Sequence, residues 1–186
     1  MLGAHRFASP SFKRPRLRWS ARVKPQASFQ GRRMLSLDHK IPPPVVGALV
    51  AAAMWSVSAL GPHFPVSAGV KYTAVAILVV AGVAFDVLGL LAFRISRTTV
   101  NPLTPERASS MVTGGVYRIT RNPMYVGMAL LLLAWGIYLL ALLPLAGPVV
   151  FVLYITRFQI KPEERALEGI FGEGYLAYAA RVRRWL

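Results

Sequence analysis

Four long apolar segments dominate the pattern of hydrophobic and polar positions along this chain. They cover residues 45–60, 70–93, 124–143 and 145–160. The second is long enough to cross a hydrocarbon core of about 30 Å, which takes about 20 helical residues. The first and the fourth are short for full spans and are expected to be tilted or lengthened by flanking residues. The pattern predicts an all-α integral membrane protein with about four transmembrane helices.

Glycine and proline separate these segments from one another. Gly61 and Pro62 end the first segment, and Pro144, Gly147 and Pro148 lie around the boundary between the third and the fourth. Both residue types interrupt helices, proline because it lacks an N–H group and glycine because it is conformationally free. The third and fourth segments are therefore predicted to form a tight helical hairpin.

Basic residues indicate which connections face the cytoplasm. They are frequent before the first segment, between the second and the third, and after the fourth. The connection from the first to the second segment holds only His63 and Lys71, and the one from the third to the fourth holds no charge. This distribution predicts both termini on the cytoplasmic side of a bacterial inner or plasma membrane. The polar stretches 96–122 and 161–186 would then meet on that side, where we expect any chemistry.

Cysteine is absent, and the three histidines lie far apart in the sequence. The chain therefore offers no disulfide and no thiolate ligand, and no metal site is expected. The formal net charge of +15 is unevenly distributed, because nine of the 22 basic residues fall within the first 33 positions, before any acidic residue. The remainder is typical of a membrane protein with basic cytoplasmic loops, which argues against a nucleic-acid partner.

The first 33 residues mix Arg, Lys, Pro and Ser without an apolar period, and this basic extension is predicted to be disordered. Three explanations stay open: an upstream segment from a misassigned start, with Met34 as the true first residue, a targeting peptide, or a tail that binds anionic lipids. We favour the first, because a coherent membrane protein begins just after Met34. Residues 34–186 are predicted to form one domain.

A glycine-rich stretch leads into the third apolar segment. Gly114 and Gly115 allow tight turns, and Arg121 and Asn122 come directly before Pro123. Proline suits the first turn of a helix, where unpaired backbone N–H groups attract a carboxylate or phosphate. Arg121 can grip the same anion with two hydrogen bonds. The residues equally fit a capped membrane helix whose arginine reaches for the interface, so both interpretations stay open.

A second polar cluster follows the fourth apolar segment. Glu163 and Glu164 come just after a proline, in the first turn of a helix, where the helix dipole favours acids. The same pair also suits a cationic or hydroxyl-bearing ligand. Tyr175, Tyr178 and Val182 recur at helical spacing, which predicts an amphipathic C-terminal helix lying at the membrane surface.

Asp86 is an acidic residue within the second apolar segment. An ionisable residue inside a membrane span is by default a candidate for function. No basic residue on a neighbouring span is an evident partner for it. Asp86 is therefore expected to act directly, to lie near the interface, or to form a hydrogen bond within the bundle.

Taken together, the polar clusters form a series of short motifs in a fixed order. The motifs are Gly115-Val116-Tyr117, Arg121-Asn122-Pro123-Met124-Tyr125-Val126-Gly127, Glu163-Glu164 and Phe171-Gly172-Glu173-Gly174-Tyr175. This series resembles the isoprenylcysteine carboxyl methyltransferase family, within the wider group that includes the phospholipid N-methyltransferases. The resemblance covers roughly residues 94–186.

The resemblance implies a cytoplasmic site for S-adenosylmethionine. Carried over by position, the cofactor-binding residues would be Ser109, Ser110, Met111, Val112, Tyr117, Arg121, Asn122, Pro123, Met124, Tyr125 and Glu163. Catalytic roles would fall to Arg121, Asn122 and Glu164. Arg157 and Gln159 would contact the substrate. The arginine suits the methionine carboxylate, a glutamate suits the ammonium group or a ribose hydroxyl, and apolar walls suit the adenine.

Two positions depart from the family pattern. Asn122 replaces the usual histidine and keeps a donor and an acceptor, but it cannot hold a charge. Gln159 stands where the carboxyl-methylating enzymes place an arginine that contacts substrate, which argues against a prenylcysteine carboxylate as acceptor. We therefore expect methyl transfer to a lipophilic acceptor with a carboxylate, amine, thiol or hydroxyl nucleophile. A nicotinamide-dependent membrane reductase related to sterol reductases and a non-catalytic membrane binding protein are the alternatives.

Overall fold

The apolar segments form helices in the computed structural model, which describes residues 41–96 and 111–186. Within these ranges there is no strand, only two isolated β-bridges, so the predicted all-α class is confirmed. The predicted basic extension, residues 1–33, lies outside the described residues. In chain order the α-helices are α1 (Pro43–Ser58), α2 (Ala68–Ser96), α3 (Pro123–Leu139), α4 (Gly147–Ile155), α5 (Lys161–Phe171) and α6 (Glu173–Arg181).

Among the described residues, two helices are long and apolar enough to cross a membrane. One is Ala68–Ile95 in α2, and the other is the continuous helix Leu143–Phe171, which includes α4 and α5. α1 has 16 residues and α3 has 17, so each covers about 25 Å, slightly less than the hydrocarbon core. Four complete spans therefore stay a prediction.

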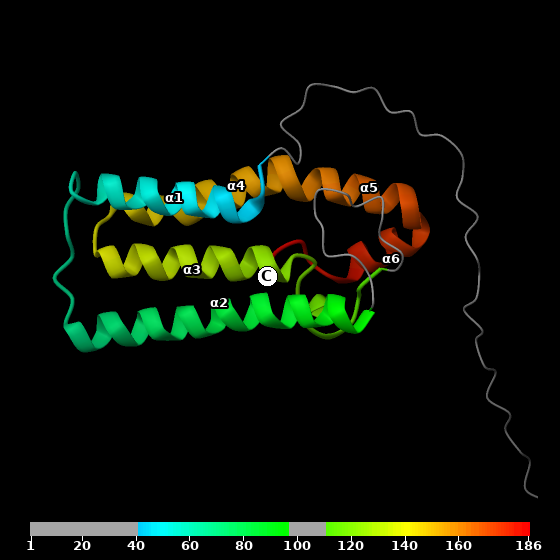
Figure 1. Ribbon diagram of the computed structural model, residues 1–186, viewed down its shortest axis with the longest axis horizontal. Coiled ribbons are helices and arrows are strands. Elements are labelled where there is room, and N and C mark those ends of the chain that lie inside the picture. Colours follow the sequence, from blue (N-terminus) through cyan, green and yellow to red (C-terminus); the bar gives the residue numbers. More distant parts are fainter. Residues whose placement is uncertain (1–40, 97–110) are drawn as a thin grey trace, which may run out of the picture. The chain divides into compact units, whose positions relative to one another are not determined.

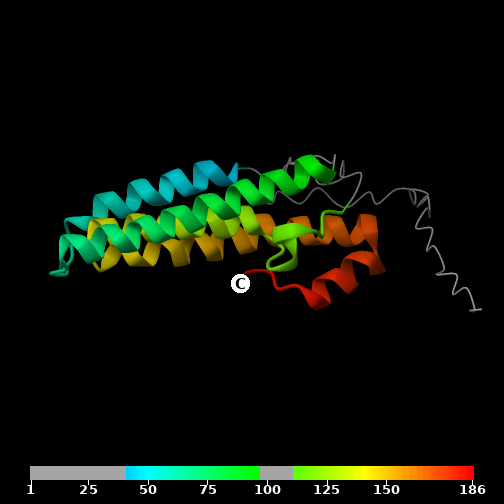
Figure 2. The same cartoon turned by 90° about the horizontal axis from the view of Figure 1, so that it is seen from below.

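α3 lies at the centre of the helix bundle (Figures 1 and 2). Its residues are apolar on all sides, which suits a helix covered in several directions. α1 and α4 pack against one side of α3, and α2 packs against the other. Trp135 of α3 also donates its indole N–H to the carbonyl of Ala51 in α1, 3.1 Å away. The buried core on the α1 and α4 side consists of Val46, Met54, Tyr125, Leu132, Phe151, Ile155 and Ile160.

Glycines let α2 and α3 approach each other closely. A Cβ atom at Gly82 would lie 3.0 Å from the carbonyl oxygen of Gly127. A Cβ atom at Gly127 would lie 2.7 Å from the carbonyl oxygen of Gly82, and it would overlap the carboxylate of Asp86. Small residues at such crossings allow close backbone packing, which stabilises helix pairs in membranes. Asp86 therefore lies in the α2–α3 contact, and its Oδ1 is buried without a hydrogen-bond partner among the described residues.

The connection from α1 to α2 and the connection from α3 to α4 meet at one end of the bundle. Phe64 donates its backbone N–H to the carbonyl of Leu140 over 2.9 Å, and Leu142 donates to the carbonyl of Pro62 over 3.2 Å. The opposite end carries α5, α6 and the 3-10 turn η2 (Gly115–Arg118). Polar sequence from the two halves of the chain is thus gathered at that second end, which we call the polar end.

The apolar pattern suggested that the fourth helix ends near residue 160. In the structure the helix continues beyond that residue, to Phe171. A π-helical turn, η4 (Thr156–Ile160), joins α4 directly to α5. An α-helix rarely continues through a proline, because the ring clashes with the carbonyl four residues earlier. The wider π turn comes just before Pro162, and the helix passes through that residue without a break. π turns of this kind are frequent at functional sites.

The C-terminal helix differs from the amphipathic surface helix that the spacing of Tyr175, Tyr178 and Val182 suggested. α6 ends at Arg181, and Val182 has extended backbone angles, φ −120° and ψ 131°. Tyr175 and Tyr178 are buried, with 4% and 6% of their surface exposed. Their common face therefore packs into the protein at the polar end rather than presenting itself outward.

The glycine contact between α2 and α3 predicts a stability effect. Gly127→Ala is expected to lower the free energy of unfolding by about 1–3 kcal/mol, because the helices must separate to accept the new methyl group. Thermal unfolding in detergent measures the change. Gly69→Ala is the matched control, because a Cβ atom at Gly69 meets nothing within 4 Å. Equal stability of the two variants would contradict the close contact.

Candidate functional site

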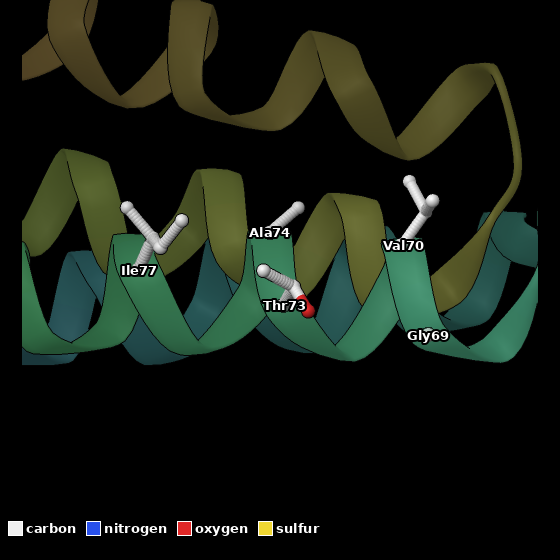
Figure 3. A pocket seen from close by; sticks show the side chains of 5 residues that line it. All are labelled: Gly69, Val70, Thr73, Ala74 and Ile77. Carbon is white, nitrogen blue, oxygen red and sulfur yellow. The ribbon is translucent and has the colours of Figure 1, made fainter.

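A hollow lined by described residues lies away from the predicted site residues. It has a volume of about 340 Å³ and lies on α2, near the end opposite the polar end (Figure 3). Its lining carries a single hydroxyl group and no ionisable side chain. This apolar surface suits contact with lipid chains, and none of the predicted site residues lines it. The lining residues are Gly69, Val70, Thr73, Ala74 and Ile77.

The glycine-rich stretch before α3 is anchored on the end of α2. Gly115 has a φ of +58°, a conformation that glycine adopts without strain. The turn η2 that follows buries Val116 and Tyr117. The ring of Tyr117 meets the ring of Phe93 edge to face, with 5.6 Å between centroids, and Val112 is buried in the same small cluster. This packing fixes the position from which the chain enters α3.

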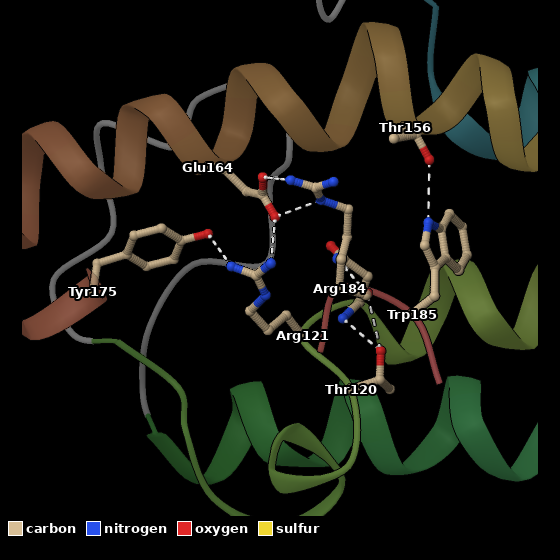
Figure 4. A network of polar contacts seen from close by, with 8 residues as sticks. Thr120, Arg121, Thr156, Glu164, Tyr175, Arg184 and Trp185 are labelled. Carbon is tan, nitrogen blue, oxygen red and sulfur yellow. Dashed lines mark hydrogen bonds and ion pairs between the residues drawn. The ribbon is translucent and has the colours of Figure 1, made fainter. Parts of the chain in front are cut away.

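The C-terminal tail, residues 182–186, holds this entry from the other side (Figure 4). Arg121 donates its backbone N–H to the carbonyl of Arg183 over 2.9 Å. The hydroxyl of Thr120, which is fully buried, donates to the carbonyl of Arg184 over 3.1 Å. Trp185 donates its indole N–H to the hydroxyl of Thr156 in η4, 3.1 Å away. The tail thereby joins the start of α3 to the π turn.

Asn122, which replaces the usual histidine, takes part in the same arrangement. Its side-chain amide donates to the carbonyl of Arg184 over 2.9 Å, and its backbone N–H donates to the Thr120 hydroxyl over 3.2 Å. The amides of Tyr125 and Val126 donate to the carbonyl of Asn122. Most N–H groups expected to be free at the start of α3 are therefore satisfied, and an anion must rely on the arginine side chain instead.

Glu164 lies between two arginines and forms what we call the charge network (Figure 4). Arg184 makes two contacts with its carboxylate, at 2.9 Å and 2.6 Å. Arg121 lies 3.2 Å from the same carboxylate and donates to the hydroxyl of Tyr175 over 3.3 Å. The Arg121 side chain is 13% exposed. Its Nε is buried and has no hydrogen-bond partner among the described residues, so one donor of the guanidinium is available.

Glu163, the neighbouring residue, has different partners. The hydroxyl of Tyr125 in α3 and the side-chain amide of Gln159 in η4 both donate to its Oε1, each over 2.8 Å. Successive residues of a helix point about 100° apart, which directs the two glutamates to different surroundings. Glu164 meets guanidinium groups, and Glu163 meets neutral donors next to the core.

Buried tyrosines complete the polar end. Tyr178 donates its hydroxyl to the carbonyl of Tyr117 over 2.8 Å. Burial raises the pKa of Tyr178 to about 12. Burial also raises the pKa of Tyr175 to about 12, and the charge of Glu164 acts in the same direction. Both phenols therefore stay protonated at neutral pH and act as uncharged hydrogen-bonding groups.

The remaining predicted site residues lie in several places. Pro123 and Met124 lie against Gly89 of α2, Met111 is half-buried, and the predicted cofactor residues Ser109 and Ser110 lie outside the described residues. The two predicted substrate residues differ in exposure. Gln159 is buried, whereas Arg157 is exposed and lies over the ring of Phe158, 5.2 Å from its centroid.

Sequence reasoning missed Thr120, Arg184 and Trp185. Their bonds link positions 20 to 64 residues apart in the chain, and no local spacing signals such pairs. The basic residues after the fourth apolar segment pointed to this region only in general terms.

Comparison with known proteins identifies the family of this chain. A sequence profile described as phospholipid methyltransferase matches residues 70–174, more than half of the chain. The chain belongs to the phospholipid methyltransferase family. An uncharacterized protein of Haemophilus influenzae is 46% identical to it over 63 residues, which make up 34% of this chain and 100% of that protein. No solved structure matches.

Membership in the phospholipid methyltransferase family confirms the resemblance drawn from the motifs. It identifies the chain as a methyltransferase-family membrane protein. The matched range begins near the start of α2 and ends in α6, so it includes Arg121, both glutamates and the turn η4. The tail that holds Arg121 in place lies beyond the match.

The tail contacts generate a prediction about stability. Thr120→Val keeps the shape of the side chain but removes the donor to Arg184 and the acceptor for the Asn122 amide. The free energy of unfolding is expected to fall by about 1–3 kcal/mol, because buried polar groups lose their partner. Thr73→Val on the exposed face of α2 is the control, measured by the same thermal unfolding. A loss no larger than that of the control would show that the tail contact is not formed.

Proposed function

We propose that this protein transfers a methyl group from S-adenosylmethionine to a lipophilic acceptor in the membrane. The observation that carries the proposal is the state of Arg121. Its guanidinium is largely buried at the start of α3, is fixed by Glu164 and Tyr175, and retains a buried donor that meets no partner in the described part of the chain. Family membership supports methyl transfer as the chemistry.

The residues at the polar end fit the amino-acid part of the cofactor. Arg121 would hold the carboxylate, since guanidinium and carboxylate form strong charge-assisted hydrogen bonds. Glu164, 17% exposed, would face the ammonium group. The cluster around Val112 and Tyr117 offers an apolar wall for the adenine. When bound, S-adenosylmethionine supplies a methyl group attached to a positively charged sulfur, which needs little acid catalysis to leave.

Four spans with both termini in the cytoplasm are part of the proposal. Both helical hairpins turn at the end that carries His63 and Lys71, whereas the polar end is rich in arginine. Positively charged segments stay on the cytoplasmic side of membranes. The cofactor would then enter from the cytoplasm, and a lipid acceptor would reach the polar end from the bilayer. Orientation and exclusion of water would supply much of the rate.

An amine is the acceptor that fits best. Glu163 presents a carboxylate to the core with neutral partners from Tyr125 and Gln159. A carboxylate acceptor would be repelled there, whereas a cationic headgroup would be attracted. Gln159 is buried where the carboxyl-methylating enzymes have an arginine. The absence of that positive charge also favours an amine over a carboxylate as the acceptor.

Titration calorimetry with S-adenosylmethionine tests the cofactor assignment, using full-length protein in detergent. Arg121→Ala is expected to weaken binding about 10-fold to 100-fold, the effect of losing hydrogen bonds from a charged group. Arg118→Ala, an exposed arginine of the same segment, is the matched control and should bind like the wild type. Thermal unfolding establishes that each variant is folded.

The same experiment separates the alternatives. Folded wild-type protein that binds NADPH and not S-adenosylmethionine would be a reductase. Protein that binds neither would be a non-catalytic membrane binding protein. Equal binding by the Arg121 and Arg118 variants would remove Arg121 from the cofactor site.

A further inference from the structure

We propose that Arg184, in the C-terminal tail, is a positioning residue of the cofactor site, and that it leaves the positive charge of Arg121 available to the cofactor carboxylate. Arg184 acts through Glu164, which both arginines contact. This inference rests on the proposed function. It adds to the site a residue that lies beyond residues 70–174, the range that the family profile matches.

The two arginines of the charge network do not contact Glu164 equally. Arg184 donates its Nε to Oε1 over 2.9 Å and its Nη2 to Oε2 over 2.6 Å. Two bonds of this kind between one guanidinium and one carboxylate make a strong, directional ion pair. Arg121 reaches Oε1 with one nitrogen, Nη2, over 3.2 Å. Of the two arginines, Arg184 therefore offsets the larger part of the charge of Glu164.

The other donors of Arg121 face neutral surroundings. Its Nη1 donates to the hydroxyl of Tyr175 over 3.3 Å, and burial keeps that phenol uncharged by raising its pKa to about 12. Its Nε is buried and meets no hydrogen-bond partner among the described residues. Because both arginines are permanently charged, the charge network holds one positive charge in excess. That excess lies on Arg121, where the proposed function places the cofactor carboxylate.

Removal of the Arg184 side chain would change the charge that an anion meets at Arg121. Arg121 and Glu164 would remain as a pair without net charge, and the acid would lie next to any carboxylate that the arginine binds. Two carboxylates at short range repel each other, and water screens this repulsion poorly because the Glu164 side chain is only 17% exposed. Loss of Arg184 should therefore weaken the binding of an anionic group at Arg121.

The backbone of the tail holds Arg184 beside the start of α3. The carbonyl of Arg184 accepts hydrogen bonds from the Thr120 hydroxyl and the Asn122 side-chain amide, over 3.1 Å and 2.9 Å. The preceding carbonyl, that of Arg183, accepts the backbone N–H of Arg121 over 2.9 Å. Figure 4 shows that both guanidinium groups point toward Glu164 from this entry. The tail contacts thus bring the second arginine to the acid in a fixed orientation.

Titration calorimetry with two ligands tests this role, using full-length protein in detergent. One ligand is S-adenosylmethionine, and the other is its decarboxylated form, which keeps the adenosine, the sulfonium and the amine. Arg184→Gln is expected to weaken the binding of S-adenosylmethionine about 10-fold, because Glu164 then repels the carboxylate. The decarboxylated form should bind within about twofold of the wild-type affinity or more tightly, because the less balanced Glu164 attracts its amine.

Two further variants are the controls. Arg181 is exposed at the end of α6, and its side chain bonds to the carbonyl of Ala177 in the same helix. Arg181→Gln removes the same charge from the polar end without changing the charge network, so both ligands should bind as they do to the wild type. Arg184→Lys keeps the charge but not the two-bond geometry, and it should restore most of the affinity for S-adenosylmethionine. Binding of the decarboxylated form establishes that each variant is folded.

A double-mutant cycle tests whether Arg184 acts through Glu164. In protein that already carries Glu164→Gln there is no acid beside Arg121 to balance. The added change Arg184→Gln should then alter the affinity for S-adenosylmethionine by about twofold or less, since coupled residues have non-additive effects.

Three results would overturn the inference. Equal weakening of both ligands by Arg184→Gln would indicate general damage to the site rather than a loss of charge balance. Wild-type affinity for S-adenosylmethionine in that variant would remove Arg184 from the site. A 10-fold loss that persists in the Glu164→Gln background would show that Arg184 does not act through Glu164. Absence of S-adenosylmethionine binding by the folded wild type would instead refute the proposed function itself.

Discussion

The contact of Glu164 with two arginines is the interaction on which the polar end depends. A largely buried carboxylate is stable there because Arg121 and Arg184 both contact it, and loss of Glu164 would leave the two guanidinium groups without their shared counter-ion. The network joins the start of α3, the helix α5 and the C-terminal tail. Arg121 is thereby fixed in direction before any ligand arrives. Such preorganisation lowers the cost of binding an anion.

The π turn η4 gives the neighbouring glutamate a different environment. It allows the helix to continue through Pro162, and it turns Gln159 toward the core, where it meets Glu163 together with Tyr125. Adjacent side chains that look equivalent in a motif thus face cations in one case and neutral donors in the other. The two carboxylates therefore have different electrostatic surroundings although they are neighbours in the sequence.

Packing in the apolar part of the bundle supports this arrangement. The glycines of α2 and α3 bring the two backbones together, and η2 packs on the end of α2 through Tyr117 and Phe93. Asp86 belongs to this helix contact, since its carboxylate lies against Gly127 and not within the charge network. Its place in the second apolar segment therefore reflects the α2–α3 crossing.

The sequence by itself determined the helices, because apolar length, proline and glycine act locally, and it also indicated the methyltransferase family through motifs in a fixed order. It placed Arg121 and the paired glutamates at one end of the bundle. Only the tertiary structure decided that Val182 leaves the helix, that Asn122 and Thr120 bind the tail, and that Glu163 and Glu164 have different partners. These features depend on hydrogen bonds between segments up to 64 residues apart. Local propensity carries no information about such pairs, because they form only when the helices pack.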